Sequence, residues 1–174
     1  MDNQQERFFF ARGWLAAMIE GEGSICLVHG AKRKEGYYKL YPMIQITNTK
    51  LNLIEFTAGL AKRLGLPLHI SSGKYGEGQL RYDIRVTGLG RVKRWLQELS
   101  MFLISKQEQA KLILEFIDVR ERLIKEHPWR KPYGEREEEI YYAIRELNKR
   151  RGEISSTTIR FTPSTERRRR DSLV

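Results

Sequence analysis

Two carboxylates end the most apolar segment near the start of the chain. The stretch WLAAMIEGEGSI, residues 14–25, reads as a helix that stops at an acid-glycine-acid-glycine turn and continues as a strand. A carboxylate at a helix C-terminus opposes the negative end of the helix dipole, at a cost of about 0.3–1 kcal/mol. Glu20 and Glu22 therefore indicate a site for a positive ligand. A glycine-capped helix end followed by a solvated turn is the alternative interpretation.

Other familiar catalytic centres are not indicated. His29, His69 and His127 are scattered, and with the one cysteine, Cys26, they lack the spacing of zinc ligands. No serine or cysteine nucleophile is paired with a nearby histidine. A single cysteine also excludes an internal disulfide, which fits a reducing compartment.

The composition indicates a basic globular protein. The 174 residues suffice for one sizeable domain, and 32 Lys and Arg against 22 Asp and Glu give a net charge of +10. Such an excess points to a polyanionic partner, most often nucleic acid. The apolar run FFFARGWLAAMI is too short for a membrane span and lacks the flanks of a signal peptide. We expect a soluble intracellular protein, in the cytoplasm, the nucleoid or an organelle, with no membrane partner.

A helix and two hairpins must position the acids. A helix over 7–19 precedes two pairs of strands with clean alternation, and a helix from residue 51, capped by Gly65, separates the pairs. The side chains expected to face the core are Ile25, Leu27, Leu40, Pro42, Ile44, Ile46, Leu80, Tyr82, Ile84 and Val86. The opposite face carries Ser24, Lys39, Tyr41, Gln45, Thr47, Arg81, Asp83, Arg85 and Thr87. Polarity favours His69 and Ser71 on that face of the third strand, but a one-residue slip would expose Ile70 and Ser72 instead.

The second half of the chain is expected to be mainly helical. Helices are predicted over 89–98, 106–126 and 136–150, and GEG at 76–78 is read as a hairpin turn, so that the acidic helix end occurs once. We predict a core over 1–127, a linker and C-terminal helix over 128–150, and a basic tail over 151–174. The tail is either a solvated segment or an arm that contacts phosphates.

The order helix, hairpin, helix, hairpin, helix, opened by WLAAMIEGEGSI, resembles the LAGLIDADG homing endonucleases over roughly residues 8–120. The resemblance implies an α+β αββαββα fold: a four-stranded antiparallel sheet saddle with helices on one face, followed by C-terminal helices. It also implies an intron-encoded enzyme that hydrolyses both strands of a long DNA site and leaves 3′ overhangs. One motif per chain implies a homodimer with the motif helices at its centre.

The resemblance assigns roles by position. Glu22 corresponds to the metal-binding carboxylate, and the carbonyl of Gly21 to a further ligand, whereas Glu20 is chiefly structural. Asn48 falls where a polar residue helps to order the nucleophilic water, and Lys106 corresponds to the basic residue near the scissile phosphate. The dimer interface is expected at Gly13, Ala16, Ala17 and Glu20. The chain departs from the family pattern at Ala17, where the motif has glycine, and at Asn52, where a basic residue is common.

Double-stranded DNA is the expected partner. Outward strand side chains would read bases in the major groove while basic side chains hold phosphates. The predicted DNA-binding residues are Ser24, Lys32, Arg33, Lys34, Lys39, Tyr41, Gln45, Lys50, Ser72, Lys74, Arg81, Asp83 and Arg85.

The expected cofactor is Mg²⁺, or another divalent cation such as Mn²⁺ or Ca²⁺ in its place, because these ions take carboxylate, phosphate and water oxygens. One Glu22 per chain is too little for a cage, but two chains would bring two such acids together. Two alternatives remain: a splicing cofactor (maturase) that binds intron RNA, and a sequence-specific DNA-binding protein that does not cut.

Overall fold

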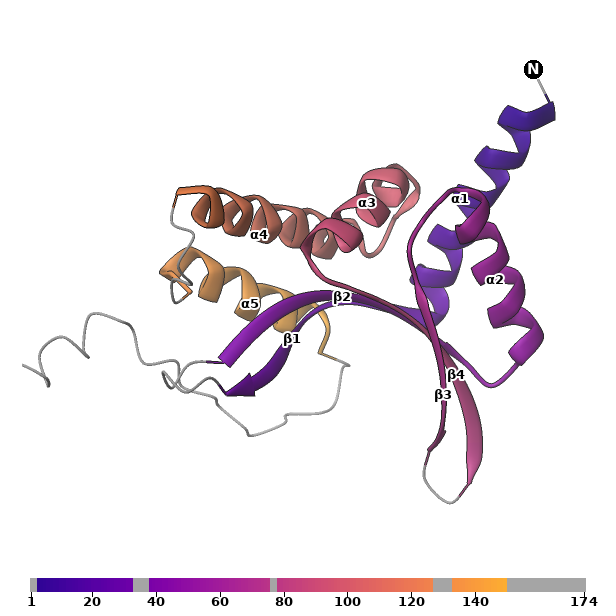
Figure 1. Ribbon diagram of the computed structural model, residues 1–174, viewed down its shortest axis with the longest axis horizontal. Helices are drawn as coiled ribbons and strands as arrows, with labels where there is room; N and C mark the ends of the chain where they lie inside the picture. The colour runs from indigo at the N-terminus through magenta and orange to yellow at the C-terminus, as the bar shows by residue number, and fades with distance from the viewer. Residues whose placement is uncertain (1–2, 33–37, 76–77, 127–132, 150–174) are drawn as a thin grey trace, which may run out of the picture.

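The computed structural model describes residues 3–32, 38–75, 78–126 and 133–149 (Figure 1). The elements, in chain order, are α1 (Asn3–Glu22), β1 (Gly23–Lys32), β2 (Tyr38–Asn48), α2 (Leu51–Arg63), β3 (His69–Tyr75), β4 (Gln79–Thr87), α3 (Leu89–Leu99), the short 3₁₀ helix η1 (Ser100–Phe102), α4 (Gln107–Glu126) and α5 (Glu135–Leu147). This order confirms the predicted αββαββα arrangement followed by C-terminal helices.

The four strands form one antiparallel sheet in the order β1-β2-β4-β3. The two hairpins therefore lie side by side, with β2 and β4 in the middle. Ile46 pairs with Ile84 across this central contact, and Ile25 pairs with Ile44 in the first hairpin. The predicted alternation agrees with these registers, because paired residues lie on the same face and the central apolar residues meet one another there.

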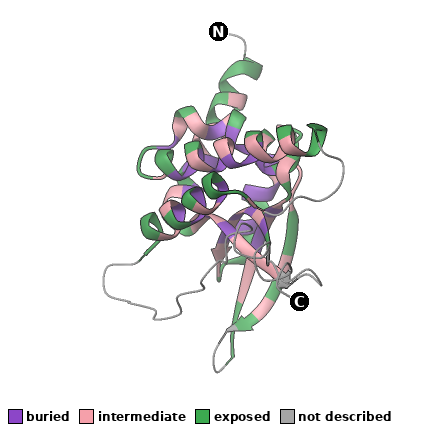
Figure 2. Cartoon of the chain, turned by 90° about the vertical axis from the view of Figure 1, so that its left-hand side faces the viewer, coloured by how far each residue is buried: buried purple, intermediate pink, exposed green. Residues whose placement is uncertain are grey.

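One face of the sheet packs against the helices and forms the core. Figure 2 shows buried residues concentrated between the helices and this face. Eight of the predicted inward residues are buried: Ile25, Leu27, Leu40, Pro42, Ile44, Ile46, Ile84 and Val86. Leu80 lies on the same face of β4 as Ile84, as predicted, but it is 44% exposed and does not reach the core. It lies near the tip of the β3–β4 hairpin, which extends beyond the helices in Figure 1.

The register of β3 decides which of its faces is polar. Ser71 pairs with Asp83 and His69 with Arg85, so these four side chains share a face. The orientation favoured by polarity is confirmed. Ser72 pairs with Tyr82 and lies on the opposite face, because successive side chains of a strand alternate.

The end of α1 differs from the predicted turn. The helix continues through Glu22, and β1 begins directly at Gly23. Neither Gly21 nor Gly23 has a positive φ, so backbone freedom is not what requires a glycine here. A Cβ atom on Gly23 would lie 2.8 Å from the Cα of Ile19 and 2.9 Å from the carbonyl oxygen of Gln45. Gly23 is therefore needed for the close approach of α1 to β2.

Gly65 ends α2 as the sequence predicts. It has a φ of +65°, and its N–H donates to the carbonyl of Lys62 at 2.9 Å. The N–H of Leu66 donates to the carbonyl of Ala61, also at 2.9 Å. These two bonds form a Schellman motif, which satisfies carbonyls at the helix end and uses glycine's access to positive φ.

Helix α5 belongs to the same core as the sheet. Ile140 and Ile144 are buried in it, and the side-chain amide of Asn148 donates to the carbonyl of Ile25 at 2.8 Å. Because β1 is an edge strand, this bond satisfies a carbonyl group at the sheet edge. Tyr133 also joins this region to β2, since its hydroxyl bonds both the N–H and the carbonyl of Leu40.

Several predicted features lie outside the described residues: the phosphate contacts Arg33 and Lys34, most of the 76–78 turn, the linker up to residue 132, the domain boundary after residue 127, and the basic tail. Lys32 ends β1, but its side chain is not described. Among the described residues, no helix is long and apolar enough to cross a membrane.

Candidate functional site

Glu22 is the last residue of α1 and is exposed. Its carboxylate makes no hydrogen bond or ion pair with the part of the chain that the structure describes. Gly21 beside it is also exposed, and a Cβ atom there would meet nothing within 4 Å. The last carbonyls of a helix have no partner within the helix. Carboxylate and carbonyl oxygens thus lie together on an open surface.

Glu20, two residues earlier, is fully engaged within the chain. One carboxylate oxygen accepts from the N–H groups of Ile104, at 2.8 Å, and Lys106, at 3.1 Å. The other accepts from the N–H of Ser105, at 3.2 Å, and from its hydroxyl. Burial alone would raise the pKa of Glu20, but these hydrogen bonds hold the pKa below its ordinary value. Glu20 therefore anchors the segment that leads into α4.

The side chain of Lys106 binds the end of α1. Its ammonium donates to the carbonyl oxygens of Ile19, at 2.7 Å, and Glu20, at 2.5 Å. Desolvation lowers the pKa of Lys106, and the charge of Glu20 opposes this shift. A cation at the C-terminus of a helix is stabilising, so Lys106 supplies part of the positive charge that the acidic helix end requires. Its role at a phosphate stays a prediction.

Asn48 lies at the end of β2, next to the end of α1. Gly23 pairs with Ile46, and the strands run antiparallel, so residues beyond Ile46 pass alongside the last turn of α1. The side-chain oxygen of Asn48 accepts from the N–H of Lys50 at 2.8 Å, which fixes the bend into α2. The amide nitrogen of Asn48 has no hydrogen-bond partner in the described ranges. Its role in ordering water stays a prediction.

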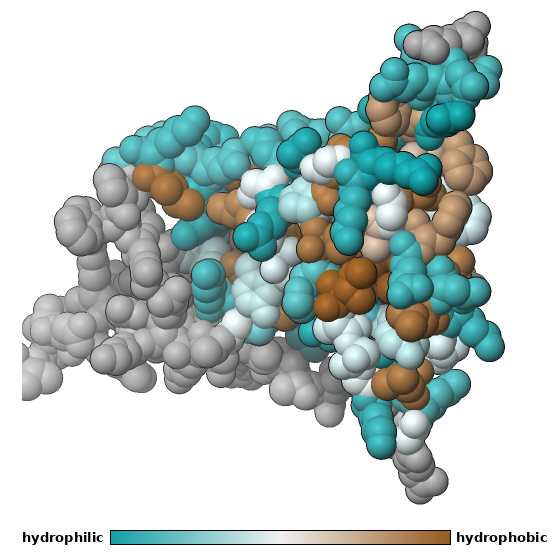
Figure 3. All heavy atoms as spheres, turned by 45° about the vertical axis from the view of Figure 1, so that its right-hand side comes forward, coloured by the Kyte–Doolittle hydropathy of each residue, from teal (hydrophilic) through white to brown (hydrophobic). Residues whose placement is uncertain are grey.

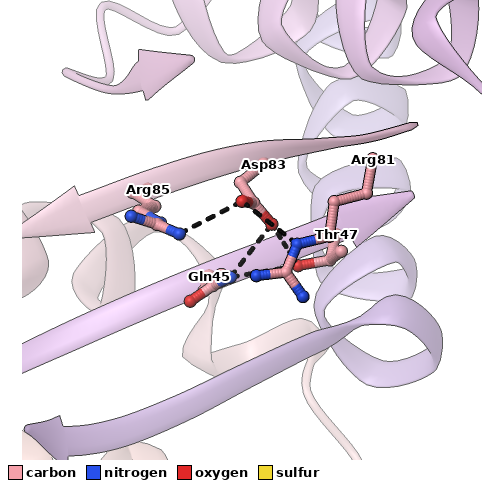
Figure 4. Close-up of polar contacts among 5 residues, drawn as sticks. All are labelled: Gln45, Thr47, Arg81, Asp83 and Arg85. Carbon is pink, nitrogen blue, oxygen red and sulfur yellow. Dashed lines mark hydrogen bonds and ion pairs between the residues drawn. The ribbon is translucent and has the colours of Figure 1, made fainter. Parts of the chain in front are cut away.

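A buried carboxylate organises the polar face of the sheet (Figure 4). Asp83 is 3% exposed, and its Oδ1 accepts from the hydroxyl of Thr47, at 2.6 Å, and from Nε2 of Gln45, at 3.0 Å. Its Oδ2 lies 3.1 Å from Nη2 of Arg85 and 3.8 Å from Nε of Arg81. Burial alone would raise the pKa of Asp83, but these hydrogen bonds and positive charges hold it below its ordinary value.

Other predicted DNA-binding residues are divided between the two faces. Ser24, Gln45, Arg85 and His69 form one row across the sheet, because each pairs with the next. By alternation along β2, Tyr41 and the exposed Lys39 share this face, and Lys50 is exposed just beyond the strand. Ser72 and Lys74 lie on the opposite face of β3, away from Asp83.

The predicted dimer residues on α1 do not all lie on one surface. Gly13 and Ala17 line a surface groove along α1 together with Gln5, Glu6, Phe9, Phe10 and Trp14. Phe9 is 65% exposed and Phe10 54% exposed, and Figure 3 shows apolar surface beside the N-terminal turns of α1. Ala16 is 1% exposed and lies in the chain's own core. It directly precedes Ala17, so it points to a different side of the helix from the groove.

Comparison with known proteins rests on structure. No protein-family model matches the sequence, and no curated protein matches it. I-CvuI, solved in complex with its target in the presence of calcium, has a TM-score of 0.60 and 19% identity, over 96% of this chain and 94% of that chain. The archaeal intron-encoded I-Vdi141I, complexed with DNA, has a TM-score of 0.61 and 19% identity, over 82% and 86%. I-CeuI, encoded by a group I intron and complexed with DNA, has a TM-score of 0.57 and 14% identity, over 84% and 70%.

The chain has the LAGLIDADG homing endonuclease fold. Within this fold, sequence reasoning missed the burial of Asp83 and the part that Thr47 plays in it. Thr47 and Gln45 are two residues apart on one face of β2, but their contact with Asp83 depends on the pairing of β2 with β4, which neither strand specifies alone. The role of Asn148 at the edge of this LAGLIDADG sheet likewise carried no local signal, because it depends on a contact 123 residues away.

Proposed function

We propose that this chain is a site-specific double-strand DNA endonuclease that works as a homodimer with Mg²⁺ or a similar divalent cation. The observation that carries the proposal is the exposed carboxylate of Glu22, which has no partner among the described residues, at the end of α1 in a LAGLIDADG fold. The solved structures of similar fold were determined with DNA, and the net charge of +10 suits the same partner.

The residues at the end of α1 fit a hard cation. The carboxylate of Glu22 and the carbonyl of Gly21 are oxygen donors, and both residues are exposed. Among the described residues, no group of three or more His, Cys, Asp or Glu side chains comes together as a metal cage. A site completed by phosphate oxygens and a second chain accounts for so small a set of ligands. When bound there, the cation would activate water and stabilise the leaving oxygen.

The remaining residues serve binding and position. Lys106 and Glu20 fix the end of α1 against α4, so that Glu22 keeps one orientation relative to the sheet. The polar face around Asp83 would lie in the major groove. The groove that contains Gly13 and Ala17 would take the same helix of a second copy, because small residues let helix backbones approach closely.

Replacement of Glu22 by Gln tests the metal and catalytic assignment. We expect Glu22→Gln to bind a selected DNA duplex nearly as well as wild type but to lose cleavage of a plasmid carrying that site. Metal binding followed by calorimetry in the DNA complex should weaken in the same variant. Cleavage at the wild-type rate would refute the assignment. Tight binding of intron RNA by wild type, without cutting of the matching DNA in Mg²⁺, would favour the splicing-cofactor alternative.

A charged residue in the α1 groove tests the homodimer. Ala17→Arg should shift the protein from dimer to monomer in sedimentation and abolish double-strand cleavage. Gly90→Arg is the matched control, because Gly90 is an exposed residue of α3 with open space around it. A monomeric wild type, with and without DNA, would rule out the paired-helix arrangement.

A further inference from the structure

The side-chain amide of Gln45 is held in one orientation. Its Nε2 donates to Oδ1 of Asp83, at 3.0 Å, and to the hydroxyl oxygen of Thr47, at 3.1 Å. These two acceptors lie only 2.6 Å from each other, too close for the two diverging N–H bonds of one amide, so they share a single N–H and leave the second N–H free. Figure 4 shows the Gln45 carbonyl oxygen pointing away from Asp83.

The chemistry of the neighbours fixes this polarity. The lowered pKa of Asp83 keeps it ionised at neutral pH, and an ionised carboxylate only accepts hydrogen bonds. The Thr47 hydroxyl gives its proton to Asp83 at 2.6 Å, so towards Gln45 it acts as the acceptor. If the amide turned over, its oxygen would face two acceptors. The outward group of Gln45 is therefore a carbonyl oxygen.

We propose that Asp83 is a positioning residue that orients the amide of Gln45 to read adenine. This inference rests on the proposed function. Adenine and cytosine present an amino donor in the major groove, whereas guanine and thymine present a carbonyl acceptor. A free glutamine contacts adenine through its oxygen and nitrogen together, which distinguishes adenine from cytosine. Here Asp83 and Thr47 hold one N–H, and the carbonyl oxygen and the second N–H remain for these two contacts, so Gln45 favours adenine.

Asp83 itself is not available to a base. Its side chain is 4% exposed, and both oxygens are already in contact with neighbouring side chains. Arg85 lies directly opposite Gln45 on β4, and its side chain remains 42% exposed while Nη2 is held by Asp83. Its Nε is buried, so the accessible donors of Arg85 are those at the exposed end of the guanidinium. Asp83 therefore sets an acceptor and a donor side by side on the polar face.

Selection from a randomised DNA duplex library by the full chain tests this reading. The contacted position is the one whose preference disappears in Gln45→Ala. There, wild type should favour A over C, G and T by about 5- to 150-fold. Asp83→Asn should lose this preference, because an amide can donate as well as accept and so lets Gln45 turn over. Asp118→Asn is the matched control: it removes one carboxylate charge from α4, in the helix layer.

The possible results of this selection distinguish a failure of the inference from a failure of the proposed function. A preference at that position for C, G or T would overturn the adenine reading. An unchanged preference in Asp83→Asn would overturn the positioning role. Thr47→Val removes the second anchor of the amide and should also broaden the preference; if Asp83→Asn fails to fold, this variant decides. Failure of wild type to enrich any duplex would instead refute the proposed function.

Discussion

Glu20 and Glu22 stand two residues apart at one helix end, yet their replacement should have opposite consequences. Both oxygens of Glu20 accept hydrogen bonds from the segment before α4, whereas Glu22 has no such partner among the described residues. Glu20→Gln would place an amide nitrogen against a backbone N–H and weaken the bonds that remain, because hydrogen bonds to a charged group are roughly twice as strong as neutral ones. Glu22→Gln removes a charge that the helix dipole disfavours.

The magnitude follows from the contacts of Glu20. A side chain that caps backbone N–H groups contributes about 0.5–2 kcal/mol, and the site is only partly buried, so water replaces part of the loss. We expect Glu20→Gln to lower the free energy of unfolding by about 1–2 kcal/mol. At about 2–4 °C per kcal/mol for a chain of this size, the melting temperature falls by about 2–8 °C. Glu22→Gln should leave it unchanged or slightly higher.

The stability difference between wild type and Glu20→Gln should depend on pH. The folded pKa of Glu20 lies below its ordinary value, so its stabilising contribution is fully present above the unfolded pKa and is lost as the pH falls through the folded pKa. The difference between wild type and Glu20→Gln should therefore be complete at pH 7 and vanish under acid conditions. Thermal unfolding followed by circular dichroism at several pH values measures it. Equal melting temperatures at pH 7, or a larger loss in Glu22→Gln, would refute the reasoning.

Three further substitutions test the packing around the site by thermal unfolding. Gly23→Ala should cost about 1–3 kcal/mol, because its Cβ would lie 2.8 Å from the Cα of Ile19. Gly21→Ala, where the Cβ meets nothing within 4 Å, should instead stabilise the monomer by about 0.5–1 kcal/mol. Trp95→Phe should cost about 1–3 kcal/mol. It removes the indole N–H that donates to the carbonyl oxygen of Pro67 at 2.8 Å and leaves that oxygen without this partner.

Local patterns in the sequence were sufficient to predict the sheet. Leu40, Pro42, Ile44 and Ile46 alternate along β2 with Tyr41, Met43 and Gln45, and the structure buries the first set on one face. The β3 face, ambiguous from its short sequence, follows from polarity because Ser71 pairs with Asp83. Gly65 was predictable as a cap because helix ends have a local glycine signature. Leu80 departs from the pattern, since alternation fixes a face but not whether a helix covers it.

The contacts of charged side chains were not predictable in this way. Asp83 alternates outward with Arg81 and Arg85, as a solvated strand face would, and its burial comes from Gln45 and Thr47 on the neighbouring strand. A strand pattern shows which face a side chain takes but not which cross-strand neighbours close over it. The organisation of the polar face therefore depends on the β2–β4 register, which one strand alone does not specify.

The end of α1 shows the same limitation in the residues on which the proposed chemistry depends. Positive charge stabilises an acidic helix end, but the sequence leaves open whether that charge comes from the chain or from a ligand. The fold answers in part: Lys106, 86 residues beyond Glu20, binds the last carbonyls of the helix, and the backbone N–H groups beside it take the carboxylate of Glu20. Glu22 lies beyond the reach of these contacts and keeps its charge exposed. Because the described part of the chain engages Glu20 and leaves Glu22 without a partner, Glu22 is the acid at which we propose that an external cation binds.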